Sequence, residues 1–246
     1  MTDRLKVALS KGKLLEPALE LLNRVGLAPK DITSESRRLV FEHPSSGTTF
    51  MIVRPSDVPT YVEYGAVDAG IVGADVLMEQ ATDVYEPLDL GFGACRLAVA
   101  VPQAALQRAP KGTVLRVATK YPNATERYFT AKGIPVEIIK LSGSVELAPL
   151  VGLADHIVDL VSTGKTLRAH HLVVTDVIAE STARLIVNRA SLKVKYRRVN
   201  SLIEALRAGL PMGRGASGRA WAMGKRTRLG GSGAGRVTWR VQGGRS

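Results

Sequence analysis

The chain has 246 residues, of which 45% are hydrophobic, and a formal net charge of +12. This length suffices for one large domain or two modest ones with a real core, and no apolar run approaches the ~20 residues of a membrane span. The single cysteine excludes an internal disulfide, and the N-terminus lacks the long apolar segment of a secretory signal. Together these features predict a reduced, cytoplasmic setting.

The excess of positive charge is concentrated near the C-terminus. Residues 209–246 contain eight Arg or Lys, no Asp or Glu, and 11 of the 24 glycines, so the rest of the chain carries only 12 − 8 = +4. This segment shows no hydrophobic periodicity and many turn formers, which predicts a disordered Gly/Arg-rich tail. A contact with nucleic acid or a partner, or a frame-altered end, is the alternative.

The first strand and helix flank a basic turn. Residues 5–9 alternate and are β-prone, and residues 14–25 place apolar side chains at helical spacing. Between them, residues 10–13 form a polar, glycine-containing turn. A strand, a basic turn and a helix make a candidate anion site to which Lys11 and Lys13 supply charge. A solvated turn is the alternative.

The next strands end at a charged residue. Strands are predicted at 38–42 and 49–53 around a Pro-Ser-Ser-Gly turn. The second leads directly into Arg54 and a helix start, a position at the carboxyl edge of a sheet, where ligands bind in α/β folds. Arg54 is therefore a predicted site residue, with a surface salt bridge as the alternative. A buried strand over 66–73 and a helix over 74–80 follow.

Strands and helices continue to alternate in the second half. Strands are predicted at 84–88, 96–101, 114–118, 136–140, 157–161, 172–178 and 184–188, and helices at about 119–132 and 191–206. The alternation predicts an α/β fold with largely parallel sheets.

Site-like residues gather in two clusters, which predicts two lobes facing one cleft. The clusters are residues 10–13 with 54–57, and residues 119–125 with 142–167. The predicted lobe I comprises 1–91 and about 180–208, and lobe II comprises 92–179, with hinges near 91–93 and 175–182.

The most informative stretch is 146–167, ELAPLVGLADHIVDLVSTGKTL. A buried strand containing Asp159 runs into a hydroxyl-rich turn and a helix start, which presents several N–H groups to one phosphate. A Walker A loop requires glycine five residues before Gly164, where this chain has Asp159, so a P-loop nucleotide triphosphatase is excluded. A phosphate-binding turn with Asp155 and Asp159 nearby suits a sugar phosphate, because carboxylates accept hydrogen bonds from ribose hydroxyls.

Longer segments carry a family resemblance. They are LKVALSKGKL at 5–14, RPSDVPTYVEYGAVDAGIVGADVL at 54–77, DLGFGACRLAVAV at 89–101, VATKYPNATERYF at 117–129 and LSGSVELAPLVGLADHIVDLVSTGKTL at 141–167. In this order they resemble the ATP phosphoribosyltransferase family in its short catalytic form, over about residues 5–208. The resemblance implies two periplasmic-binding-protein-like (type II) lobes with a cleft between them.

The resemblance also implies a reaction. The phosphoribosyl group of phosphoribosyl pyrophosphate is transferred to N1 of the adenine of ATP, and pyrophosphate is released, as the first step of histidine biosynthesis. Mg²⁺ is the expected cofactor, bound through substrate phosphates and water, so no protein metal ligand is predicted.

Roles for single residues follow from the resemblance. The predicted catalytic residues are Arg54, Lys11 and Asp159. The predicted substrate-binding residues are Ser10, Lys13, Arg37, Glu146, Asp155, Ser162, Thr163, Gly164, Lys165 and Thr166. Asp155 as a turn cap and Glu146 as a helix-start residue are the alternatives.

The resemblance implies a partner as well. Short-form members work in a hetero-oligomer with a regulatory subunit that resembles histidyl-tRNA synthetase, and no regulatory domain is recognised here. The main competing function is a non-catalytic two-lobe protein that binds small anions, against which the missing export signal and residues 159–166 argue. A nucleic-acid-binding protein using the basic tail is the second alternative.

Overall fold

The computed structural model describes residues 4–29, 32, 38–106 and 114–211. All of these residues belong to one compact unit, Met1–Arg214. From residue 212 onward the predicted tail lies outside the described residues, so its disorder stays a prediction. None of the described helices combines the length and apolar character needed to cross a membrane.

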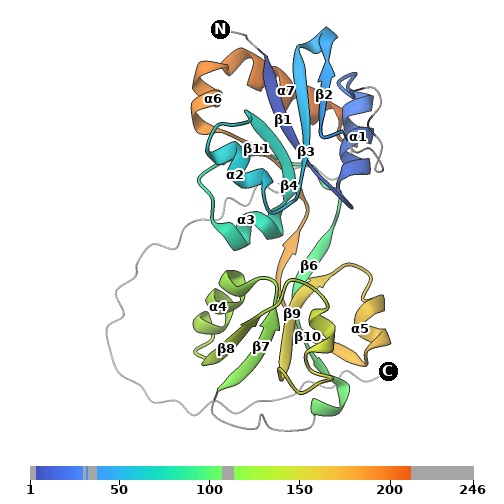
Figure 1. The fold of residues 1–246 in the computed structure, drawn as a ribbon, viewed down its shortest axis with the longest axis vertical. Helices are drawn as coiled ribbons and strands as arrows, with labels where there is room; N and C mark the ends of the chain where they lie inside the picture. The colour runs from blue at the N-terminus through green and yellow to red at the C-terminus, as the bar shows by residue number, and fades with distance from the viewer. Residues whose placement is uncertain (1–3, 30–31, 33–37, 107–113, 212–246) are drawn as a thin grey trace, which may run out of the picture. The chain divides into compact units, whose positions relative to one another are not determined.

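One of the two sheets of the unit has six strands, ordered β2-β3-β1-β4-β11-β5 (Figure 1). Its strands are β1 (Leu5–Ser10), β2 (Val40–His43), β3 (Thr48–Val53), β4 (Ala69–Gly73), β5 (Tyr85–Asp89) and β11 (Ala183–Val187). Its helices are α1 (Leu15–Arg24), α2 (Val58–Glu63), α3 (Ala74–Gln80), α6 (Arg189–Val194) and α7 (Tyr196–Gly209). We call this sheet and its helices lobe I.

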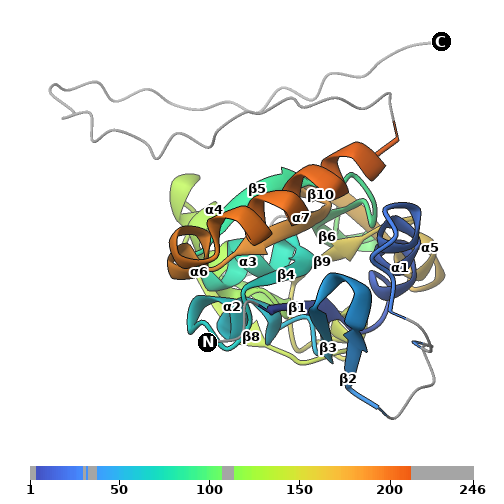
Figure 2. The ribbon, with the colours of Figure 1, turned by 90° about the horizontal axis from the view of Figure 1, so that it is seen from above.

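The alternation of side chains in β1 gives lobe I a core on each face of its sheet. Val7 and Leu9 pack with α1 and α7, whereas Ala8 points the other way and packs with α2 and α3. The helices accordingly cover both faces, with α1 beside α7 on one of them (Figure 2).

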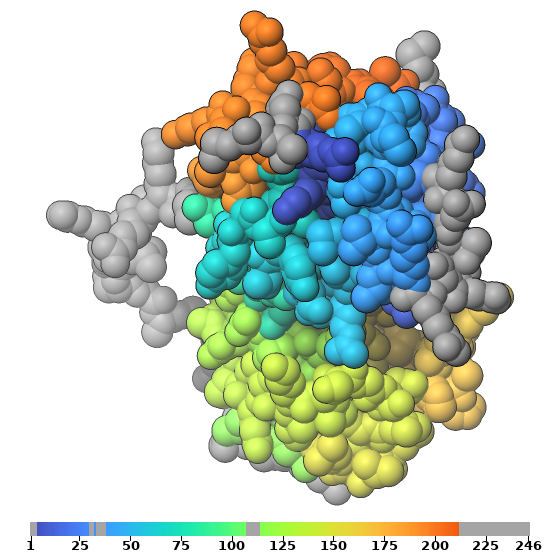
Figure 3. All heavy atoms as spheres, turned by 45° about the horizontal axis from the view of Figure 1, so that its top comes forward, coloured from blue at the N-terminus to red at the C-terminus, as the bar shows by residue number. Residues whose placement is uncertain are grey.

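Lobe II is a five-stranded sheet ordered β10-β6-β9-β7-β8. Its strands are β6 (Cys95–Pro102), β7 (Leu115–Thr119), β8 (Val136–Lys140), β9 (His156–Val161) and β10 (Leu172–Ser181), and its helices are α4 (Pro122–Ala131) and α5 (Lys165–Ala169). Ile157 packs toward α5 and the adjacent Val158 packs toward α4, so this sheet is also covered on both faces. The space-filling view shows the boundary at which the two lobes touch (Figure 3).

The α/β class is confirmed, but the prediction of largely parallel sheets is wrong. Four strand pairs are parallel (β1–β3, β1–β4, β7–β8 and β7–β9) and the other five are antiparallel. The pair β2–β3 is antiparallel because a short 3₁₀ turn, Pro44–Ser46, joins its strands as a hairpin. The other antiparallel pairs are β6–β10, β6–β9, β4–β11 and β5–β11. Each of them contains β6 or β11, the strands that follow the two passages between the lobes.

The single C-terminal helix predicted at 191–206 is two helices. They are separated at Lys195, whose backbone leaves the helical region at φ −113° and ψ 33°. Its ammonium donates to the carboxylate of Asp68 and the carbonyl of Arg4, each at 2.9 Å. These bonds tie the break to the residues that directly precede β1 and β4.

The chain passes between the lobes after β5 and between β10 and β11. The predicted hinge at 91–93 falls in the first passage, and the predicted range 175–182 lies mostly within β10. At Gly93 the backbone has φ +68°, and an added Cβ would lie 2.2 Å from Cδ2 of Leu14. Only glycine fits this passage without displacing Leu14.

Candidate active site

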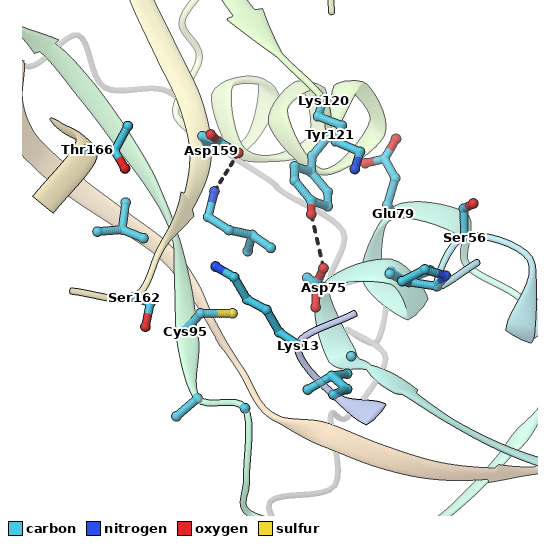
Figure 4. A pocket seen from close by; sticks show the side chains of 18 of the residues that line it. Lys13, Ser56, Asp75, Glu79, Cys95, Lys120, Tyr121, Asp159, Ser162 and Thr166 are labelled. Carbon is cyan, nitrogen blue, oxygen red and sulfur yellow. Dashed lines mark hydrogen bonds between the residues drawn. The ribbon is translucent and has the colours of Figure 1, made fainter. Parts of the chain in front are cut away.

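A pocket of about 970 Å³ lies where strands of both lobes end (Figure 4). Lobe I contributes residues that follow β1, β3 and β4, and lobe II contributes residues at the ends of β7, β8 and β9. These are carboxyl ends of strands, the edge at which α/β folds bind ligands.

Cationic side chains dominate the pocket. They are Lys11, Lys13, Arg54, Lys120, Lys140 and Lys165. Within the described part of the chain none of them forms a salt bridge. Their charges are therefore available to an anion, and confinement between the lobes strengthens the positive potential there.

The loop 162–166 lines the pocket with all five of its residues. Gly164 takes a left-handed conformation, φ +70°, at the entry to α5, and a Cβ there would lie 3.3 Å from Nη1 of Arg168. Arg168 itself donates to the carbonyl of Thr163 at 3.1 Å, which braces the loop from outside the pocket. Because this bond holds the loop in place, its backbone N–H and side-chain hydroxyl groups can point at a phosphate.

Asp159 lies in β9, just before this loop, and lines the same pocket. Its Oδ1 accepts the N–H of Leu160 at 2.8 Å, the bond drawn in Figure 4. Among the described residues its other oxygen has no hydrogen-bond partner. Burial raises the pKa of the Asp159 carboxyl, and the Glu146 carboxylate adds to the rise, against the Leu160 N–H and the charges of Lys120 and Lys13.

Asp155 corrects the sequence analysis. It precedes β9, at the end of the strand away from the pocket, and forms a salt bridge with Arg116 at 3.1 Å. Its Oδ2 also accepts both the side-chain Nε–H and the backbone N–H of Arg116, each at 3.2 Å. These bonds lower the pKa of the Asp155 carboxyl. The prediction that Asp155 faces the ribose is wrong, because the carboxylate serves an ion pair at the other edge of the sheet.

Ser10 is a second correction. Its side chain is buried in β1, and its hydroxyl donates to the carbonyl of Ile71 in β4 at 2.7 Å. The hydroxyl is thus used inside the sheet and does not line the pocket. Arg37 lies outside the described residues, so its role stays a prediction. All the other predicted site residues line the pocket.

The sequence analysis missed a buried carboxylate. Asp75 accepts a hydrogen bond from the hydroxyl of Ser181 at 2.8 Å. It accepts another from the hydroxyl of Tyr121 at 3.1 Å (Figure 4). Burial and then the charge of Asp75 raise the pKa of Tyr121, so its phenol stays protonated and donates. Burial likewise raises the pKa of the Cys95 thiol, and the charge of Asp75 raises it further. The hydrogen bond with Ser181 and the charge of Lys13 lower that pKa, but by less. A carboxylate in the first turn of a helix is common, so Asp75 carries no distinctive sequence signal.

Lys140 and Glu79 were also missed. Lys140 is the last residue of β8, and Glu79 belongs to α3. Both line the pocket, but Glu79 lies just outside the segment 54–77 and Lys140 just outside the segment 141–167. Among the described residues no cluster of three or more His, Cys, Asp or Glu side chains could hold a metal.

The fold defines a class, the two-lobe α/β proteins. The periplasmic aliphatic sulphonate binding protein SsuA from Escherichia coli has this fold: TM-score 0.53 at 11% identity, covering 85% of this chain and 73% of that chain. The alkanesulfonate-binding protein SsuA from Xanthomonas axonopodis pv. citri, with TM-score 0.50, 14% identity and coverage of 85% and 73%, has it too. The predicted type II fold is confirmed.

Sequence similarity then defines the family. The ATP phosphoribosyltransferase (HisG) family model matches residues 54–208. ATP phosphoribosyltransferase 2 of Geobacter sulfurreducens is 56% identical over 208 residues, which cover 84% of this chain and 98% of the relative. A chain of the ATP phosphoribosyl transferase (HisG:HisZ) complex from Thermotoga maritima superposes with a TM-score of 0.74 at 36% identity, covering 84% of this chain and 98% of that one. The chain belongs to the ATP phosphoribosyltransferase family.

Proposed function

We propose that the pocket between the lobes transfers the phosphoribosyl group of phosphoribosyl pyrophosphate to N1 of the adenine of ATP. The observation that carries the assignment of roles is the position of Asp159, three residues before Ser162 of the loop 162–166 and lining the same pocket. The loop binds the 5′-phosphate, and the free carboxylate oxygen of Asp159 accepts a ribose hydroxyl. Lys11, Lys13 and Arg54 of lobe I bind the pyrophosphate and the phosphates of ATP.

The reaction explains which residue types line the pocket. The bond from N1 to the anomeric carbon forms while the bond from that carbon to the pyrophosphate oxygen breaks. Neutral N1 already carries the attacking lone pair, so the step needs no general base. Catalysis then rests on placing the two substrates and on stabilising the charge of the departing pyrophosphate. The cations that line the pocket can supply that stabilisation.

The charge of the pocket supports a metal ion that arrives with the substrates. The six cations face four carboxylates, those of Asp75, Glu79, Glu146 and Asp159, a formal balance of +2. Two polyphosphate substrates exceed this charge. Mg²⁺ bound to the substrate phosphates and to water would neutralise pyrophosphate oxygens as they leave.

We also propose a protein partner. The Thermotoga maritima relative was solved as a HisG:HisZ complex, and this chain covers 98% of the matched chain. A HisZ-type regulatory subunit, assembled with this chain as a hetero-oligomer, follows by analogy with that complex. Function in the cytoplasm belongs to the same proposal.

The proposal is tested by turnover. The purified chain, alone and with a HisZ-type subunit, is mixed with ATP, phosphoribosyl pyrophosphate and MgCl₂, and both pyrophosphate and phosphoribosyl-ATP are measured. Equal amounts of the two products are expected. Binding of both substrates without either product, with the partner present, would instead support the non-catalytic anion-binding protein.

A further inference from the structure

The helix α4 lacks a cap of its own. Its N-cap residue, Tyr121, makes no side-chain capping bond, and Pro122 has no N–H. The free N–H groups of the first turn are those of Asn123 and Ala124. Both donate to the carboxylate of Glu79 in lobe I, to Oε1 at 3.0 Å and to Oε2 at 2.9 Å. Lobe I therefore supplies the cap for a helix of lobe II.

The same contact caps the end of α3. The last carbonyls of a helix have no partner within it. The side-chain amide of Asn123 donates to the carbonyl of Glu79 at 3.1 Å, and the guanidinium of Arg127 donates to the carbonyl of Met78. The C-terminal end of α3 thus meets the N-terminal end of α4, and each helix satisfies backbone groups of the other. The opposed ends of the two helix dipoles favour this arrangement.

We propose that α3 positions the start of α4 in the active pocket, with Glu79 as the positioning residue. Lys120 and Tyr121 directly precede α4 and line the pocket. The hydroxyl of Tyr121 donates a hydrogen bond to Asp75, which lies in α3 like Glu79 (Figure 4). The contact therefore fixes a cation and a phenol of lobe II relative to lobe I. It also holds together two lobes that are otherwise joined covalently by only two chain passages. This inference rests on the proposed function for its kinetic readout.

The reciprocal caps should favour the closed arrangement of the lobes before substrates bind. Without them the closed fraction falls, and the apparent affinity for substrates falls by the same factor. Saturating substrates restore closure, so the maximal rate is kept. A purely structural role gives the opposite pattern, because a partly unfolded preparation has a lower kcat at an unchanged KM.

Two variants approach the contact from opposite sides. Glu79→Ala removes the cap of α4, and Arg127→Met removes the donor to α3 while keeping an apolar stem. Loss of one helix cap corresponds to roughly a fivefold shift in an equilibrium. We expect KM for both substrates to rise by about two- to fivefold in each variant, and further in the double variant, with kcat close to wild type. Glu126→Ala is the matched control, since this exposed glutamate of α4 has no bonding partner among the described residues.

A distance measurement tests the same point without turnover. Spin labels attached through p-acetylphenylalanine at two exposed positions, Tyr64 in lobe I and Thr130 in lobe II, leave Cys95 intact. In the full chain both variants should show a longer or broader distance distribution than wild type, and pyrophosphate with MgCl₂ should narrow it. An unchanged KM and distance in the double variant, or a lower kcat at unchanged KM, would overturn the proposal. If the wild type forms no product, the proposed function fails, but the distances still decide whether α3 positions α4.

Discussion

Asp159→Asn is the sharpest test of the site, because the structure dictates how the new amide must lie. The N–H of Leu160 requires an acceptor at the position of Oδ1, 2.8 Å away. The amide oxygen will take that place, and the NH₂ group will face the pocket. An acceptor for a ribose hydroxyl thereby becomes a donor, although shape and volume hardly change.

The expected loss follows from the strength of that bond. A hydrogen bond to a charged group contributes about 1.5–3 kcal/mol, so kcat/KM should fall by roughly ten- to one-hundred-and-fifty-fold. Stability should move the other way. Because folding raises the pKa of Asp159, the native state binds this proton more tightly than the unfolded chain does, and stability falls as pH rises from about 3.9 through the raised value. Asn avoids this cost, so at pH 7 the variant should be at least as stable as wild type.

Asp155→Asn, just before the same strand, is the matched control. Its pairing with Arg116 lowers the pKa of Asp155, so the stabilisation is present above the ordinary carboxyl pKa and is lost as pH falls through the lowered value. The variant should lose stability at pH 7 and keep its kcat/KM. Steady-state kinetics and urea unfolding of both variants measure the two effects. An unchanged kcat/KM in Asp159→Asn, or an equal fall in Asp155→Asn, would refute the assignment of the ribose contact to Asp159.

Three further predictions concern other parts of the chain. Arg54→Ala should lower kcat by about tenfold or more if its charge acts on the departing pyrophosphate; an unchanged kcat/KM removes it from the site. Gly164→Ala should cost about 1–2 kcal/mol, because the loop requires φ +70°, and KM for phosphoribosyl pyrophosphate should rise more than KM for ATP; equal rises would contradict a loop specific for the 5′-phosphate. Deletion of residues 212–246 should leave kcat/KM unchanged, since 208 matched residues already cover 98% of a relative. In that deletion, unchanged affinity for single-stranded DNA at low salt would eliminate the nucleic-acid alternative for the tail.

Local patterns were sufficient to predict most of the fold. The helix expected at 74–80 and the strand at 136–140 have the same bounds as α3 and β8. The features that local patterns did not predict depend on hydrogen bonds between residues far apart in the sequence. The helix break at Lys195 depends on Asp68, which lies 127 residues away in sequence. No local periodicity contains that information.

Strand geometry explains why one predicted carboxylate lines the pocket and the other does not. Asp155 and Asp159 are four residues apart, and an extended strand advances about 3.3 Å per residue, so they are separated by roughly 13 Å. A single ribose cannot reach both. This argument was available from the sequence, because the buried strand predicted at 157–161 already separates Asp155 from the phosphate loop.

The division of the pocket between lobes makes lobe geometry part of the chemistry. The loop 162–166 and Asp159 belong to lobe II, whereas Lys11, Lys13 and Arg54 belong to lobe I. The anomeric carbon must lie between a phosphate held by one lobe and a leaving group stabilised by the other. A displacement of about 1 Å at a reacting centre can cost ~100-fold in rate, so the orientation of the lobes must be fixed as closely as any side chain. Two covalent passages leave that orientation underdetermined. The bonds between α3 and α4, together with those of Asp75 to Tyr121 and Ser181, constrain it beside the pocket itself.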